Sequence, residues 1–452
     1  MSSALQKLNT LRQYIKACAL QRKLRTWRRE TLEQYQQRQL KRFAGTILAR
    51  SPYFKVCRDA PLSAWPRMDK KIMMEHFDRM NTAGLHQKAL LQQALAAEES
   101  RDFSLLPGAY SVGLSSGTSG HRGLFVTSAA ERALWSGSIL AKCLPRGLFA
   151  GERIALFLRA DNALYQNINN RFLSLVFFDL FANFEALCDR LQAYRPTIIV
   201  APAQVLAALA RKKQGQALDI EPHRVVSCAE VLSAADKTLL QKVFREVAEI
   251  YQATEGFLGA TCEQGVMHLN EEYLYIEPQW LDEQRFTPVV TDFMRSTQPI
   301  VRYQLDDVLH ATEAPCPCGR PTRSISHIEG RADDQLNLPR GHQQHVVVFA
   351  DACNRAVTRA LPANADYLLE HDSRHTRTGK HRIVLTAPVS MQHLQNAQKQ
   401  LEALFRTQQA DLDGIDWVLK SQAVARDYTI KRRRIVSAAR APALRGIGEK
   451  AS

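Results

Sequence analysis

Short runs of β-branched and apolar residues alternate with helical segments through the middle of the chain, and this alternation is the strongest constraint on its fold. Residues 154–158, 197–201 and 224–227 are typical of strands, whereas the segments typical of helices are residues 69–80, 129–143, 185–194, 204–212 and 234–247. Strands that alternate with helices pair side by side in one sheet, because each helix carries the chain back to the same edge. The sequence therefore predicts an α/β protein whose large N-terminal domain contains mostly parallel sheets.

The pattern changes near residue 335. Strand-like segments at 345–349 and 382–386 are followed by a helical segment at 390–408. This order predicts a smaller, mobile α+β C-terminal domain, and a chain of 452 residues is long enough for more than one domain. We expect three parts: residues 1–100, a basic helical region packed on the large domain; residues 101–334, the core; and residues 335–452, the small domain.

The positive charge is concentrated at the two ends of the chain. The formal net charge is +15, yet residues 1–60 alone hold 14 Lys and Arg against three acidic residues, and residues 426–452 hold eight against two. Leucines at helical spacing near the N-terminus predict one or two amphipathic helices with cationic outer faces. Those faces could be solvated or could meet nucleic acid or membrane headgroups. No zinc-finger spacing or aromatic RNA-binding pattern accompanies the charge, so we expect no nucleic-acid partner.

The sequence predicts no membrane span and no secretory signal. Its longest strongly apolar stretch, residues 172–184, contains Asp179 and is shorter than the roughly 20 residues that a spanning helix requires. Lys7, Arg12 and Lys16 interrupt the N-terminal leucines, unlike a signal peptide. Nine scattered cysteines, an odd number, argue against a disulfide framework. We therefore expect a cytoplasmic protein, and a homodimer stays open.

A run of small polar residues and glycines follows the strand-like segment at 110–114. It is too small to pack a core, and its backbone N–H groups and hydroxyls can surround a phosphate chain. The segment from Gly113 to Gly117 also matches Gly-x-Ser-x-Gly, the nucleophile elbow of serine hydrolases, but strand-like residues 124–127 follow it where an elbow needs a helix. A phosphate-binding loop is favoured, and the hydrolase and a plain flexible loop stay open. The loop residues are Ser115, Ser116, Gly117, Thr118, Ser119 and Gly120.

With this loop the chain resembles the adenylate-forming superfamily of acyl-CoA synthetases, whose phosphate loop reads Ser-Ser-Gly-Thr-Thr-Gly. Further segments resemble that family's motifs and occur in the family's order. They are Cys228-Ala229-Glu230-Val231-Leu232, Tyr251-Gln252-Ala253-Thr254-Glu255, Arg302-Tyr303-Gln304-Leu305-Asp306-Asp307 and Gly330-Arg331-Ala332-Asp333-Asp334. The segments Ser51-Pro52-Tyr53-Phe54, Trp65 to Lys70 and Cys316-Pro317-Cys318-Gly319-Arg320 resemble the phenylacetate-CoA ligase branch.

The resemblance implies an ATP-dependent ligase. A substrate carboxylate would attack the α-phosphorus of ATP, release pyrophosphate and form an acyl-adenylate, and because both reactants are anions the site must supply positive charge. ATP and Mg²⁺ are the expected cofactors. The acceptor would be coenzyme A, a carrier-protein thiol, or an amine or hydroxyl, and adenylyl transfer to a hydroxyl-bearing cofactor is an alternative. A basic protein that binds nucleic acid or a membrane surface is the alternative of another class.

The resemblance also implies a role for individual residues. The loop would hold the β- and γ-phosphates. Lys431 begins a run of four basic residues, so for this residue a basic surface segment is the alternative to the catalytic role that the resemblance implies. After Gly120 the chain reads His121-Arg122-Gly123 where many family members carry a lysine, and Arg122 is the expected substitute. The other implied roles are Mg²⁺ binding for Thr254 and Glu255, ribose binding for Asp307, adenine contacts for Ala229, Glu230 and Tyr251, the domain hinge for Arg331, and bridging of the carboxylate and α-phosphate for Lys431.

A zinc site is predicted from a Cys-Pro-Cys-Gly turn. Cys316 and Cys318 present two thiolates, which is half of a tetrahedral site. Cys262 and His268 are the best candidates for the other ligands, and phenylacetate-CoA ligase relatives resemble this chain in carrying a Cys, a His and a Cys-x-Cys pair here. Four protein ligands would leave no open position, so the zinc would be structural. Reduced cysteines packed in a core are the alternative.

Overall fold

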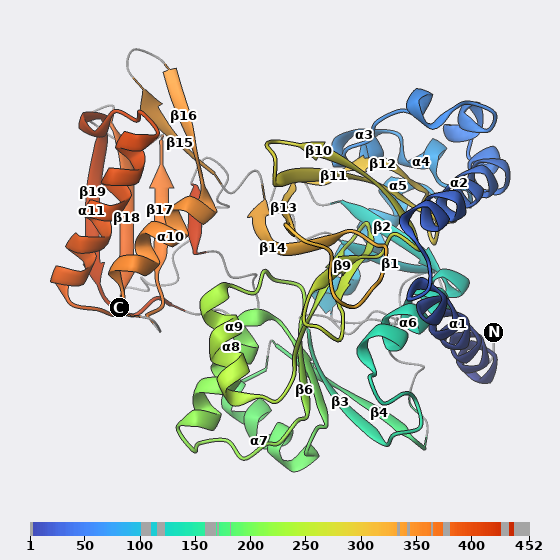
Figure 1. Ribbon diagram of the computed structural model, residues 1–452, viewed down its shortest axis with the longest axis horizontal. Helices are drawn as coiled ribbons and strands as arrows, with labels where there is room; N and C mark the ends of the chain where they lie inside the picture. The colour runs from blue at the N-terminus through green and yellow to red at the C-terminus, as the bar shows by residue number, and fades with distance from the viewer. Residues whose placement is uncertain are drawn as a thin grey trace. The chain divides into compact units, whose positions relative to one another are not determined.

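The computed structural model describes most of the chain (Figure 1). The described residues are 3–100, 110–114, 123–158, 169, 171–180, 182–331, 335–340, 344–362, 365–373, 380–425 and 434–437. The chain divides into two compact units, and the boundary between them lies between Ile328 and Glu329. Among the described helices, none combines the length and the apolar content needed to cross a bilayer. The three-part division stays a prediction.

Helices form the N-terminal part of the larger unit. Two basic helices confirm the N-terminal prediction. Residues 69–80, predicted as one helix, form two, because His76 leaves the helical conformation between them. Asp69 caps the first of these by accepting a hydrogen bond from Ile72 N (2.7 Å). The helices are α1 (Ser3–Leu24), α2 (Arg29–Thr46), α3 (Lys70–Glu75), α4 (Phe77–Met80) and α5 (Gln87–Ser100).

The largest sheet has 12 strands, and one part of it is parallel. Neighbouring strands in the order β4-β3-β5-β6-β7 run parallel, and one helix joins each pair of consecutive strands from β4 to β7. This part confirms the predicted α/β class. The helix predicted at 234–247 is shorter than expected, since residues from Val247 onward form a strand. The elements are β3 (Glu152–Leu158), β4 (Leu173–Asp179), α7 (Phe184–Tyr194), β5 (Ile198–Ala201), α8 (Ala203–Gln214), β6 (Arg224–Ser227), α9 (Ala234–Val243) and β7 (Val247–Ala253).

The rest of the same sheet contains antiparallel pairs, so the sheet is mixed. Antiparallel strands need only a short turn between them, whereas a parallel pair needs a crossover. The chain uses such a turn at Thr254 and Glu255, which join β7 to the next strand. The strands are β8 (Gly256–Thr261), β9 (Met267–Leu269), β10 (Leu274–Trp280), β11 (Arg285–Asp292), β12 (Ile300–Gln304), β13 (Asp307–Ala311) and β14 (Ser324–Arg331).

The smaller unit contains a hairpin and a four-stranded sheet of order β19-β18-β17-β20. Leu369 and Ile383 of this sheet pack with Leu394 and Phe405 of a helix in one buried cluster. The predicted α+β character of this part is confirmed. Its elements are β15 (Gln335–Arg340), β16 (Gln344–Phe349), α10 (Ala350–Ala360), β17 (Leu368–Asp372), β18 (His381–Ala387), α11 (Met391–Thr407), β19 (Ile415–Ser421) and β20 (Ile435–Ser437).

Glu152, at the start of β3, is a buried carboxylate with several partners. Its side chain contacts Arg146 Nε (2.8 Å), Thr197 Oγ1 (2.5 Å) and His223 Nε2 (3.0 Å). Burial by itself raises the pKa of a carboxyl group, but the hydrogen bonds from these three partners outweigh it and lower the pKa of Glu152 from 4.5 to about 2.

We expect Glu152→Gln to lower the free energy of unfolding by about 3 kcal/mol near neutral pH. The folded-state pKa lies below the unfolded-state value, so this contribution is present above about pH 5 and is lost as the pH falls toward about 2. Urea unfolding of both proteins across this range measures the difference. A difference that stays constant down to about pH 2 would contradict the linkage.

Candidate active site

The predicted phosphate loop lies between two paired strands. β1 (Tyr110–Leu114) runs antiparallel to β2 (Leu124–Ser128) with Leu114 opposite Leu124, so the two ends of the loop are adjacent. The six loop residues predicted at 115–120 lie outside the described residues. A nucleophile elbow passes from a strand into a helix, whereas here the strand after the loop pairs with the strand before it. This arrangement argues against the serine hydrolase.

The turn between β7 and β8 carries two side chains whose oxygen atoms could bind a metal ion. Thr254 Oγ1 donates a hydrogen bond to Glu255 Oε2 (2.9 Å). Burial, together with the charge of the nearby Glu255, raises the pKa of Tyr303, so this hydroxyl keeps its proton. A carboxylate beside a hydroxyl is a donor set that suits a hard cation such as Mg²⁺.

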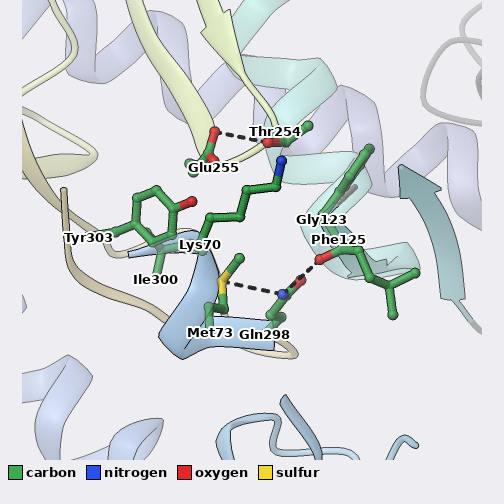
Figure 2. Close-up of a pocket in the computed structure, with 10 residues that line it drawn as sticks. Lys70, Met73, Gly123, Phe125, Thr254, Glu255, Gln298, Ile300 and Tyr303 are labelled. Carbon is green, nitrogen blue, oxygen red and sulfur yellow. Dashed lines mark hydrogen bonds between the residues drawn. The ribbon is translucent and has the colours of Figure 1, made fainter. Parts of the chain in front are cut away.

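A pocket in the larger unit brings this turn together with the exit of the loop (Figure 2). Gly123, the first described residue after the loop, lines the pocket with Thr254 and Glu255. The exit of the predicted loop and the end of the Tyr251–Glu255 motif are thus neighbours. Tyr303, from the Arg302–Asp307 motif, lines the same pocket. The lining residues are Lys70, Met73, Gly123, Leu124, Phe125, Thr254, Glu255, Gln298, Ile300 and Tyr303.

Sequence reasoning missed Lys70, the first residue of α3. Figure 2 shows its side chain extending toward Thr254 and Glu255. Its backbone is held there because Met68 pairs with β12 through two backbone hydrogen bonds of 3.1 and 2.8 Å. In the sequence, the segment that ends at Lys70 shows only a resemblance to one branch of a family. The contact with β12, far away in the sequence, is what makes the lysine part of the pocket.

The residues predicted for the ribose and the adenine also meet. Tyr251 lies on β7, and Asp307 is the first residue of β13. Tyr251 Oη donates a hydrogen bond of 2.5 Å to Asp307 Oδ2. The tyrosine is buried, whereas the aspartate is partly exposed.

Ala229 and Glu230 follow β6 in a constrained turn. Ala229 has a φ of 63°, a left-handed conformation that is uncommon for residues other than glycine. Gln204 donates from its side chain to Glu230 Oε1 (2.8 Å) and from its backbone to Oε2 (3.3 Å). These bonds tie Glu230 to the first turn of α8, where the helix dipole favours a carboxylate.

Two buried side chains brace the loop's exit strand against the Thr254–Glu255 turn. Arg295 Nη1 donates to Thr254 O (3.2 Å), and its Nη2 donates to Val126 O (3.1 Å). Gln298 accepts a hydrogen bond from Val126 N (2.8 Å) and donates one to Leu124 O (3.1 Å). Neither residue was predicted, because a buried arginine is uncommon and has no sequence signature.

A buried carboxyl group lies beneath the same turn. Asp292 Oδ2 is 2.7 Å from the position that a Cβ on Gly256 would occupy, so only glycine fits after Glu255 without a shift. Asp292 Oδ1 accepts a hydrogen bond from Met294 N (2.7 Å). Burial raises the pKa of Asp292 to about 7, although Arg295 opposes the shift. The charge beneath the turn therefore changes around neutral pH.

The four predicted zinc ligands also lie together. One possible ligand atom from each of Cys262, His268, Cys316 and Cys318 lies within 4.8 Å of the others. Cys262 Sγ is 3.7 Å from Cys316 Sγ, and Cys318 Sγ is 3.3 Å from His268 Nε2. Zinc–sulfur bonds of about 2.3 Å in a tetrahedron separate two sulfur atoms by about 3.8 Å. The spacing and the chemistry of these residues fit a tetrahedral zinc ion.

The surrounding backbone orients these ligands. Gly265 and Gly319 have φ values of 75° and 76°, and the N–H group of each donates to the carbonyl of the cysteine three residues earlier, at 3.0 and 3.2 Å. His268 Nδ1 lies 3.1 Å from Thr322 O, and donation to that carbonyl leaves Nε2 to face the thiols. Burial lowers the pKa of His268, which favours the neutral ring that a metal requires.

Three predicted residues beyond positions 115–120 cannot be placed in the site. Arg122 and Lys431 lie outside the described residues, and of Arg331 only the backbone is described, at the end of β14. Their roles stay predictions.

Comparison with known proteins shows similarity at the level of structure. No family model matches the chain, and no curated protein matches it. The crystal structure of 2-hydroxyisobutyryl-CoA ligase in the postadenylation state with R3-HIB-AMP aligns with a TM-score of 0.60 and 16% identity, over 90% of this chain and 88% of that chain. An open conformation of that ligase with 2-HIB-AMP and CoA aligns with a TM-score of 0.53 and 16% identity, over 90% of each chain. The chain therefore has the fold of the adenylate-forming ligases.

Proposed function

We propose that this protein activates a carboxylic acid with ATP, forming an acyl-adenylate and releasing pyrophosphate. The pocket in Figure 2 carries the proposal, because residues at the exit of the small-residue loop line it together with Thr254 and Glu255. The fold supports the same reaction, since it is similar to that of a ligase solved with R3-HIB-AMP.

The proposed reaction brings two anions together, and most of the catalytic contribution is therefore positioning and charge. Residues 115–120 would surround the β- and γ-phosphates with N–H groups. Lys70 would add an ammonium group beside the Thr254–Glu255 turn, and Lys431 would bridge the carboxylate and the α-phosphate. Asp307, held by Tyr251, would accept hydrogen bonds from the ribose hydroxyls.

Mg²⁺ would be held by the Glu255 carboxylate and the Thr254 hydroxyl, which lie 2.9 Å apart. When bound, the ion neutralises part of the phosphate charge. Tyr303 lines the same pocket, and its hydroxyl stays neutral because burial and the charge of Glu255 raise its pKa. Arg295 and Gln298 support Mg²⁺ binding by keeping the turn against the loop's exit strand.

For the second step we propose transfer of the acyl group to coenzyme A or another acceptor, in an enzyme of the phenylacetate-CoA ligase-like branch. The cluster of Cys262, His268, Cys316 and Cys318 supports this branch, because the resemblance implies such a set. We propose that the cluster binds a structural zinc, since four protein ligands leave no position for a substrate.

Acid-dependent exchange of labelled pyrophosphate into ATP tests the proposal. We expect exchange with at least one acid in a panel of aromatic and aliphatic acids, and none without acid. A protein that only binds nucleic acid or membranes gives no exchange with any acid. Ester cleavage that needs no ATP would identify a hydrolase instead.

We expect Lys70→Met to raise the KM for ATP by about tenfold to a hundredfold, because it removes a positive charge beside the phosphates. Initial rates of exchange at varied ATP concentration measure the effect. Lys71→Met is the matched control, since Lys71 is the next residue of α3 and is exposed. Equal KM values for the two variants would show that Lys70 has no role in binding ATP.

A further inference from the structure

The outward side of α1 exposes large aliphatic side chains. Leu5, Leu8, Leu11 and Ile15 are 45%, 61%, 37% and 58% exposed, and we name this set the α1 stripe. Spacings of three and four residues place these side chains along one side of the helix. Single exposed leucines are ordinary, but a row of them on one helix marks an interaction surface.

The opposite side of α1 is fixed on α6 (Ala129–Cys143) (Figure 1). A Cβ on Gly137 of α6 would lie only 2.6 Å from Tyr14 N, so the two helices touch backbone to backbone. Ala17 and Leu24 are buried on this side. Because one side of α1 is already packed, the α1 stripe cannot turn inward unless the helix leaves α6.

The charges of α1 are all positive. The helix contains no Asp or Glu, and its five basic residues are all exposed. At about 100° per residue, Lys7 lies on one side of the α1 stripe and Arg12 and Lys16 lie on the other. The basic residues are Lys7, Arg12, Lys16, Arg22 and Lys23.

We propose that the α1 stripe docks this protein on an anionic lipid surface. The aliphatic side chains would enter the boundary between headgroups and acyl chains, while the flanking cations contact lipid phosphates. The helix would lie along the membrane without crossing it.

The charge pattern favours a membrane over the other candidate partners. A second copy of the chain would bring one set of α1 cations against another, and the helix has no carboxylate to offset the repulsion. Nucleic acid would engage the cations through its phosphates but would leave the aliphatic row in water. An anionic bilayer matches both the charge and the apolar side chains.

Sedimentation of the full chain with vesicles tests the proposal. We expect binding to vesicles of phosphatidylcholine mixed with phosphatidylglycerol, little binding to phosphatidylcholine alone, and weaker binding at high salt. Leu8→Gln/Ile15→Gln should reduce the partition coefficient by about tenfold. Both side chains are more than half exposed, so the double variant should unfold at the temperature of the natural protein.

The matched control is Leu95→Gln/Leu281→Gln, which removes two aliphatic side chains that are 43% and 51% exposed outside α1. It should bind vesicles as the natural protein does. Charge reversal by Lys7→Glu/Lys16→Glu provides a second test and should also weaken binding. Three results would overturn the proposal: no binding to anionic vesicles, unchanged binding by both α1 variants, or a dimer that Leu8→Gln/Ile15→Gln converts to monomers in the absence of lipid. The last result would identify a second copy as the partner.

Discussion

Glu255→Gln is expected to reduce acid-dependent ATP–pyrophosphate exchange by about a hundredfold to a thousandfold. Glutamine has the shape of glutamate and can still accept hydrogen bonds through its side-chain oxygen. It lacks the negative charge that a hard cation requires, so Mg²⁺ would be held poorly beside Thr254. Initial exchange rates at saturating acid and ATP measure the loss.

Glu283→Gln is the control for this variant. Glu283 is exposed in the turn between β10 and β11, away from the lining of the pocket. It should keep the natural exchange rate, and thermal unfolding should show that both variants are folded. If Glu255→Gln retained more than about half of the activity, Glu255 would have no part in holding the ion.

Cys316→Ser/Cys318→Ser is expected to remove about one equivalent of zinc and to lower the free energy of unfolding of the larger unit by about 4 kcal/mol. Serine keeps the size of the side chain but loses the thiolate. Cys262 follows β8, His268 lies on β9, and the other two cysteines lie between β13 and β14, so loss of the ion would loosen several antiparallel strands together. Elemental analysis and urea unfolding measure the two effects.

Cys18→Ser is the matched control, because Cys18 is partly exposed on α1 and does not belong to the cluster. It should keep the zinc and the stability of the natural protein. A natural protein that contains no zinc after purification in zinc-supplemented buffer, and that unfolds like the double variant, would show that the cluster is a set of reduced thiols.

Elements with strong local signals were predictable from the sequence. The bounds predicted for α6, 129–143, are those of the structure. The reason is local: Ser128 N donates to Glu131 Oε2 (2.6 Å), and Glu131 N donates back to Ser128 Oγ (3.4 Å), which is a capping box. The zinc candidates were predictable for a similar reason, since two cysteines separated by a single residue can be recognised in the sequence alone.

Features that depend on distant contacts were not predictable. Lys70 enters the pocket only because Met68 pairs with β12, more than two hundred residues away in the sequence. The brace made by Arg295 consists of bonds to backbone carbonyl groups, which can belong to any residue type. The α9 helix was predicted too long because Val247 continues an apolar pattern that suits a helix or a strand equally.

The antiparallel part of the large sheet was not predictable either, because it also depends on contacts between residues that are far apart in the sequence. Short strands separated by helices are recognised from their spacing, which is why the parallel part was predicted. The antiparallel strands from β8 to β14 are joined by turns, and their pairing order β11-β13-β14-β9 does not follow the order of the chain. Pairing between strands that are far apart is determined by the packing of the whole sheet rather than by any one segment.

Mass spectrometry of the products formed from ATP, Mg²⁺ and a panel of carboxylic acids, with and without coenzyme A, tests the central claim most directly. We predict a species with the mass of an acid joined to AMP, which needs both ATP and that acid and is lost in Glu255→Gln. Coenzyme A should convert it to a thioester if coenzyme A is the acceptor. ATP cleaved only to ADP and phosphate, or no AMP-linked product with any acid, would contradict the claim.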